Sequence, residues 1–157
     1  SSDVVGDLWV SGDSACIGYW NRHEATKQAL RGKWFVTGDK YRVDSEGYYW
    51  YAGRADDMFK VHGQWVSPSQ VESALLEHEG VHEVAVVAAT DDRGLSCGVA
   101  FVVPVGSANK ALAAALLEHA AGSLSSYLVP ETIKFVDELP KTSTGKIQRY
   151  LLRNQTE

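Results

Sequence analysis

Three short clusters of polar and charged residues have side chains that could bind a nucleotide or a carboxylate. The first is Thr37-Gly38-Asp39, which directly follows the apolar run Trp34-Phe35-Val36. A carboxylate placed by a glycine at the end of a strand could accept two hydrogen bonds at once, which suits the paired hydroxyls of a ribose. Gly and Asp are equally typical of a plain turn, so these residues alone favour a turn over a ligand site.

The second cluster is Gly53-Arg54-Ala55-Asp56-Asp57, and the residues that follow it include Lys60, Gly63, Pro68, Val71 and Glu72. A guanidinium such as that of Arg54 can place two parallel hydrogen bonds on phosphate or ribose oxygens. A solvated connector with incidental ion pairs is the alternative, because most charged runs are of that kind.

The third cluster is Pro140-Lys141-Thr142-Ser143-Thr144-Gly145-Lys146. A phosphate-binding P-loop is excluded, because it needs a glycine where Pro140 stands and a Ser or Thr where Ile147 stands. What remains is a flexible loop of small residues that presents the ammonium group of Lys146.

The histidines predict no further site. His78 and His82 are four residues apart, but Gly80 interrupts the helix between them, so we expect no zinc or other metal site. His23 and His119 are expected at the surface. No Ser-His-Asp or Cys-His spacing indicates a catalytic nucleophile.

Short apolar runs separated by turn-forming residues predict a β-rich segment over residues 4–52, with one short helix at 22–30. The turn Asp44-Ser45-Glu46-Gly47 predicts a hairpin. Most of the five Trp and seven Tyr lie in this first third of the chain. Because aromatic side chains need large partner surfaces, this segment is expected to be the edge of a larger domain.

The chain beyond Arg54 has the pattern of a compact module that can bury its own core. A small hairpin is expected at 58–66, and a helix capped by Ser67, with Gln70 completing a capping box, is expected to stop at Gly80. The further elements expected are strands at 84–89, 99–103 and 132–136 and helices at 107–122 and 147–153. The predicted fold class is α+β: a β-rich piece of a larger domain (1–53), a hinge (54–56), and a small mobile domain (57–157) with a three-stranded sheet, flanking helices and a β-hairpin.

Composition narrows the class of protein. The 157 residues are 45% hydrophobic and carry a net charge of −5, so no polybasic surface for nucleic acid is expected. No apolar run reaches the roughly 20 residues that a membrane span needs. Two widely separated cysteines suggest no disulfide framework, which favours a cytoplasmic location.

Taken together and in this order, the three clusters resemble the adenylate-forming superfamily of acyl-CoA synthetases, luciferases and adenylation domains. The resemblance rests on Thr37-Gly38-Asp39, on residues 51–57 with the positions that follow them, and on residues 140–146. Within that family, Gly18-Tyr19-Trp20-Asn21 and residues 62–68 look most like bacterial benzoate- or hydroxybenzoate-CoA ligases.

The resemblance implies an AMP-forming acid–CoA ligase that uses Mg²⁺·ATP to make an acyl-adenylate and then transfers the acyl group to CoA. Asp39 would hold the ribose hydroxyls, and Arg54 would assist at ribose or phosphate. Asp56 matches the hinge about which the small domain swings. Lys146 matches the catalytic lysine that bridges the substrate carboxylate and the α-phosphate during adenylation.

After the swing, His62, Gly63 and Trp65 would line the passage for the pantetheine thiol. Tyr127 is a further candidate for contacting CoA, although Leu128 stands where many CoA-using relatives carry a basic residue. The phosphate-binding loop, the acyl pocket and the metal-associated glutamate of the family have no counterpart in this chain. The chain alone is therefore expected to be inactive and to need its own N-terminal domain as a partner.

Two alternatives stay open at this level. The chain could belong to an adenylation domain that loads a carrier protein instead of free CoA. It could also be a stand-alone docking or regulatory module, because the resemblance makes Lys146 a candidate substrate of a lysine acetyltransferase.

Overall fold

Strands dominate the first third of the chain in the computed structural model, which describes residues 5–156. The chain divides into two compact units, unit 1 up to Asp56 and unit 2 from Asp57 onward. The elements of unit 1 are β1 (Val5–Val10), α1 (His23–Ala29), β2 (Leu30–Arg31), β3 (Trp34–Val43) and β4 (Tyr49–Arg54).

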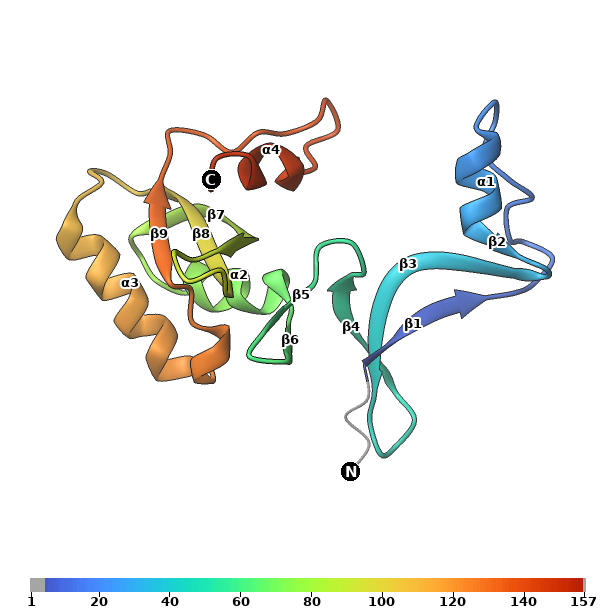
Figure 1. Ribbon diagram of the computed structural model, residues 1–157, viewed down its shortest axis with the longest axis horizontal. Coiled ribbons are helices and arrows are strands. Elements are labelled where there is room, and N and C mark those ends of the chain that lie inside the picture. Colours follow the sequence, from blue (N-terminus) through green and yellow to red (C-terminus); the bar gives the residue numbers. More distant parts are fainter. Residues whose placement is uncertain (1–4, 157) are drawn as a thin grey trace. The chain divides into compact units, whose positions relative to one another are not determined.

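Strand β3 organises unit 1, because every other strand of this unit pairs with it (Figure 1). It pairs antiparallel with β1 along most of its length, with β2 at its start and with β4 at its end. The aromatic residues of this unit are largely exposed. Tyr49 is 63% exposed, Trp50 53% and Trp9 46%, and no hydrophobic side chain is buried in the part of unit 1 that the structure describes.

Unit 2 is an α+β module built on one small sheet, as predicted. Strands β7 and β8 are antiparallel, and β9 joins β8 in parallel through a crossover that contains α3. The elements of unit 2 are β5 (Phe59–Val61), β6 (Gln64–Val66), α2 (Pro68–Leu76), β7 (Val81–Thr90), β8 (Ser96–Pro104), α3 (Lys110–Ser123), the 3₁₀ turn η1 (Ser126–Leu128), β9 (Thr132–Phe135) and α4 (Arg149–Arg153).

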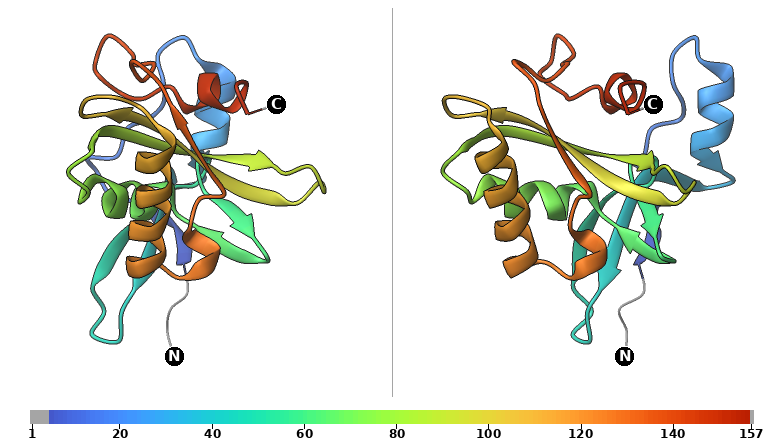
Figure 2. Two further views of the ribbon diagram at one scale, coloured as in Figure 1. Left: turned by 90° about the vertical axis from the view of Figure 1, so that its left-hand side faces the viewer. Right: turned by 60° about the vertical axis from the view of Figure 1, so that its left-hand side comes forward.

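Both faces of this sheet are covered, so alternate residues of β7 enter two different core clusters (Figure 2). Val84 and Val86 pack with residues of α2 and α3, including Leu75 and Leu116. Ala85 and Val87 face the other way and pack with Leu139 and with Leu152 of α4, among others. Because both faces are buried, the strands are nearly continuous in Val and Ala.

The cap of one helix and the start of another differ from the prediction. Helix α2 begins at Pro68 as predicted, but the predicted capping box is wrong, because the Ser67 side chain makes no capping hydrogen bond. Its hydroxyl lies 2.9 Å from that of Ser69. Helix α3 begins three residues later than predicted, because the Asn109 side chain caps it by accepting from the Leu112 amide at 2.8 Å.

The same tight turn closes one β-hairpin in each unit. In the β3–β4 hairpin, the Gly47 amide donates to the Asp44 carbonyl, and the Asp44 carboxylate accepts from two later amides. In the β7–β8 hairpin, Asp91 and Gly94 repeat these contacts. The pKa of Asp44 is lowered by the hydrogen bond from the Trp50 indole and by the backbone amides. That of Asp91 is lowered by the Leu95 amide and by Arg93.

Among residues 5–156, no helix is both long and apolar enough to cross a membrane.

Candidate functional site

The Thr37-Gly38-Asp39 cluster lies inside β3, whereas the sequence placed it after a strand. Strand β1 pairs Trp9 with Val36 and Asp7 with Lys40, so the cluster lies opposite the single residue between them and forms a bulge. The Thr37 hydroxyl holds the bulge by donating to the Leu8 carbonyl and accepting from the Asp39 amide, both at 3.0 Å.

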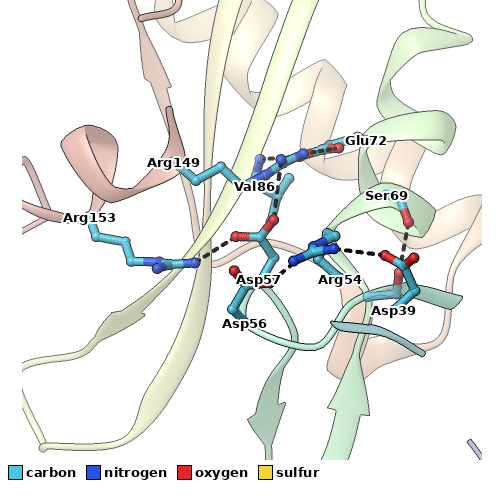
Figure 3. A network of polar contacts seen from close by, with 10 residues as sticks. Asp39, Arg54, Asp56, Asp57, Ser69, Glu72, Val86, Arg149 and Arg153 are labelled. Atoms are coloured by element: carbon cyan, nitrogen blue, oxygen red, sulfur yellow. Dashed lines mark hydrogen bonds and ion pairs between the residues drawn. The ribbon is translucent and has the colours of Figure 1, made fainter. Parts of the chain in front are cut away.

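Arg54 pairs across β3 and β4 with Asp39, so the first two predicted clusters meet in unit 1 (Figure 3). Its Nη1 donates to the Asp39 carboxylate and to the Thr37 carbonyl, each at 3.1 Å, and its Nε donates to Asp56 at 3.3 Å. Gly38 (φ 76°) lies under this guanidinium, because a Cβ there would come within 2.8 Å of Nη2. Glycine is therefore favoured at this position for two reasons: its φ is positive, and the guanidinium of Arg54 lies where a Cβ would be.

Partial burial of Arg54 lowers the pKa of its guanidinium, but the charge of Asp56 and the hydrogen bond and charge of Asp39 outweigh it, so the pKa is raised overall. An open groove of about 510 Å³ lies beside this side chain. It is lined by Tyr19, Arg22, Ala25, Gln28, Ala29, Val36, Thr37, Gly38 and Arg54. Unit 1 therefore has space for a ligand next to a cation that is fixed by carboxylates.

The loop that carries Lys146 is a closed turn of the same kind as those at Asp44 and Asp91. The Gly145 amide donates to the Thr142 carbonyl at 2.9 Å, and the Thr142 amide donates to the Lys146 carbonyl at 2.8 Å. The Thr142 hydroxyl replaces the aspartate carboxylate by accepting from the Lys146 amide at 3.1 Å. Gly145 adopts φ 82°, as glycine does in such turns.

Lys146 itself is exposed, and its ammonium forms no hydrogen bond or ion pair with any residue in 5–156. Its neighbour Lys141 is paired with Glu83 at 2.5 Å. Lys141 thus holds the loop on β7, whereas the ammonium of Lys146 is available to a ligand.

The loop between β5 and β6 places His62 and Gly63 at the tip of the small hairpin that the sequence predicted. Both have positive φ, 49° and 80°, which is the requirement of a two-residue turn of type I′. His62 lines a cleft of about 210 Å³ with residues of the β7–β8 loop and of β8, including Arg93 and Cys97. In both figures this hairpin lies far from the loop before α4 that carries Lys146 (Figures 1 and 2).

Trp65 and Tyr127, which the sequence predicted to contact CoA, are in contact with other side chains of unit 2. Trp65 is 43% exposed on β6, and the ammonium of Lys60 lies 4.8 Å from its ring centroid. Tyr127 packs, partly buried, against the core beside the buried Leu128.

Sequence reasoning missed an ion-pair network in unit 2 that joins Asp57, Glu72, Arg149 and Arg153 (Figure 3). Glu72 is only 9% exposed, and its carboxylate accepts two hydrogen bonds from Arg149. The sequence did contain one indication of this network, the placement of Glu72 among the apolar positions of an amphipathic helix. A buried carboxylate needs a partner.

His119 is not a surface residue. It is half-buried, its Nε2 lies 3.0 Å from the Ala74 carbonyl oxygen, and its ring meets that of His78 edge to face at 5.5 Å. Within the described part of the chain, no group of three or more His, Cys, Asp or Glu is placed to hold a metal ion.

Comparison with known proteins gives a consistent match. Residues 70–146 match the family model described as "AMP-binding enzyme C-terminal domain". The benzoate–CoA ligase of Thauera aromatica is 49% identical over 156 residues, which cover 98% of this chain and 30% of that protein. The 4-hydroxybenzoate–CoA/benzoate–CoA ligase of Rhodopseudomonas palustris is 45% identical over 159 residues, covering 99% of this chain and 30% of the relative.

Among solved structures, the anthranilate CoA ligase AuaEII in complex with anthranoyl-AMP superposes with a TM-score of 0.92 at 42% identity. The match covers all of this chain and 31% of that one. The chain thus spans about a third of the length of the proteins it matches.

Proposed function

We propose that this chain is the C-terminal part of an acid–CoA ligase, because residues 70–146 match the AMP-binding enzyme C-terminal domain. In the proposed reaction, a carboxylate attacks the α-phosphate of Mg²⁺·ATP and releases diphosphate, which gives an acyl-adenylate. The thiol of CoA then takes the acyl group and releases AMP. An aromatic acid is the proposed substrate, since the relatives at 45–49% identity are named for benzoate and hydroxybenzoate.

The observation that carries the proposal is the exposed, unpaired ammonium of Lys146, the residue that closes a hydrogen-bonded turn. Its main chain is fixed, while its side chain can reach a ligand. A fixed positive charge of this kind stabilises the negative charge that shifts between carboxylate and α-phosphate during adenylation. A lysine that merely sits on a mobile surface loop would lack these hydrogen bonds to its main chain.

We assign the nucleotide to the bulge in unit 1. Asp39 retains acceptor capacity for ribose hydroxyls while it holds Arg54, and Arg54 retains donors for ribose or phosphate oxygens. In this proposal Mg²⁺ arrives with ATP, and its carboxylate ligand comes from the N-terminal domain.

We further propose that the two half-reactions use different ends of unit 2. The loop before α4, which carries Lys146, and the β5–β6 hairpin, which carries His62 and Gly63, lie at different places on unit 2 (Figures 1 and 2). A hinge at residues 54–56, with Asp56 as its pivot, would exchange them against the N-terminal domain, so that His62, Gly63 and Trp65 line the pantetheine passage. Tyr127 is a further candidate contact for CoA.

The exposed Lys146 is also open to acetylation by a lysine acetyltransferase, which would remove its charge and stop adenylation. The cytoplasm is the compartment we propose for the enzyme.

Replacing Lys146 by alanine in the complete ligase tests the proposal. Adenylate formation, measured by ATP–diphosphate exchange, should fall by about 10²–10³-fold, while thioester formation from supplied acyl-adenylate is largely retained. Lys110→Ala is the control and should change neither half-reaction, because Lys110 is an exposed lysine of the same unit that lies outside this loop, at the start of α3. Equal losses in both half-reactions would rule out the proposed role of Lys146.

A further inference from the structure

Arg149, the first residue of α4, is anchored on a carboxylate that the core already fixes. Its Nη2 donates to both oxygens of Glu72, at 2.8 and 2.9 Å (Figure 3). Glu72 also accepts from the Val86 amide of β7 at 2.8 Å. The carboxylate therefore joins α2, the central sheet and α4, and it lies almost entirely out of solvent.

The same guanidinium reaches back to the start of unit 2. Its Nη1 lies 3.5 Å from the carboxylate of Asp57, which also accepts from Arg153 at 2.8 Å. Asp57 is the first residue of unit 2 and directly follows the proposed pivot Asp56. Arg149 thus connects the end of the proposed hinge with two elements of the core.

The segment that carries Lys146 is tied to Arg149 through the main chain. The Gln148 amide donates to the Pro140 carbonyl at 2.8 Å, and Lys141 and Ile147 form a β-bridge. Ile147 packs against the second core cluster. Residues 140–149 consequently form one closed segment, held by apolar packing and by the ion pairs of Arg149.

Net stabilisation is a poor explanation for this arrangement. A buried ion pair gains little over apolar residues of similar volume, because both charges lose their hydration. What the contacts do provide is a defined geometry, since one planar guanidinium reaches two carboxylates, through Nη2 to Glu72 and through Nη1 to Asp57.

We propose that Arg149 is a positioning residue that holds the Lys146 turn at a fixed place relative to the start of unit 2. In this proposal, rotation about the hinge moves Lys146 as part of a rigid body. The ammonium group therefore reaches the adenylation site in a defined position. This inference rests on the proposed function of Lys146 and extends it to a residue that does not touch substrate.

Amide hydrogen exchange on the chain itself tests the anchoring without any activity. In Arg149→Gln, exchange of the Lys146 and Gln148 amides should rise about tenfold, while the amides of the β7–β8 ladder keep their wild-type rates. The matched control is Lys134→Gln, which removes another cation that ties the C-terminal segment, through the Gln155 carbonyl at 2.6 Å. It should leave the Lys146 amide unchanged.

Kinetics of the complete ligase test the consequence. Arg149→Gln should reduce adenylation by about 10²-fold through misplacement of Lys146, with little change in thioester formation from supplied acyl-adenylate. Arg149→Lys should recover only part of this loss, because a single ammonium cannot reach both Glu72 and Asp57 as the two terminal nitrogens of the guanidinium do. Lys134→Gln should change neither half-reaction.

The outcomes separate the two proposals. Unchanged exchange at Lys146, or equal losses in both half-reactions, would overturn the role of Arg149. If Lys146→Ala leaves adenylation intact, the proposed function fails instead, and the exchange rates still decide whether Arg149 anchors the turn.

Discussion

Unit 1 and unit 2 use their apolar residues in opposite ways. Both core clusters belong to unit 2, where the sheet is covered on each face. In unit 1, strand β4 alone carries Tyr49, Trp50 and Tyr51 with at least half of each side chain exposed. Large aromatic surfaces of this kind are stabilising only when something covers them. Unit 2 therefore has its own core. Unit 1 has strands and turns, and we propose that the rest of a larger domain covers its apolar side chains.

Local structure does not follow this division. The turns at Asp44 and Asp91 have the same hydrogen bonds, although one lies in each unit. Such turns depend on an aspartate and a left-handed glycine a few residues apart, and not on a core. The units therefore differ in packing and not in the quality of their local structure.

The largest expected contrast comes from deleting one aromatic ring in each unit. Phe101→Ala removes a side chain that is 1% exposed and should destabilise unit 2 by about 3–5 kcal/mol. Tyr49→Ala removes a ring that is 63% exposed and should change that unfolding transition by less than about 0.5 kcal/mol. Urea denaturation followed by far-ultraviolet circular dichroism, where helices α2–α4 contribute most, measures both. Similar losses would mean that the two units share one core.

The two cysteines give a smaller contrast. Burial, together with the hydrogen bond and charge of Glu131, raises the pKa of the Cys97 thiol to about 11, whereas Cys16 of unit 1 is exposed. Because only the thiolate reacts, Cys97 should be alkylated by iodoacetamide about 10²-fold more slowly than Cys16 near pH 8. Mass spectrometry of timed samples gives both rates.

The raised pKa also has a defined effect on stability. A thiol that stays protonated in the fold stabilises it below the unfolded pKa, and this contribution disappears as pH rises from about 9 toward 11. The Cys97→Ser variant should lose that part of the pH dependence. Equal alkylation rates for the two cysteines would contradict the burial of Cys97.

The smallest contrast uses the repeated turn. Gly47 and Gly94 have positive φ and open space where a Cβ would lie, so alanine should cost about 1–2 kcal/mol locally at either position. Only Gly94→Ala should lower the stability of unit 2 in the same denaturation experiment. A matching loss from Gly47→Ala would show that the hairpin of unit 1 contributes to the unfolding of unit 2.

The sequence was sufficient for most secondary-structure elements, and the roles of the candidate site residues stay predictions. The β-branched runs and turn residues located the strands and hairpins of both units to within a few residues. It misplaced Thr37-Gly38-Asp39 at a strand end, because a bulge lets a strand continue through a glycine that elsewhere would terminate it. It also treated the Lys146 loop as flexible, since the role of the Thr142 hydroxyl depends on a turn that the residue types alone do not specify.

The residue types alone established which chemical groups the chain carries. They are the carboxylate of Asp39 after a glycine, the guanidinium of Arg54 where the composition of the chain changes, and the ammonium of Lys146 after small hydroxyl residues. Only the tertiary structure decided which of these meet. Arg54 faces Asp39 because β3 and β4 pair in one register, and Arg149 faces Glu72, 77 positions earlier, because α2 and α4 both pack around one sheet. The physical reason is that local propensities act over a few residues, whereas pairing between distant charges is set by the packing that brings their elements together.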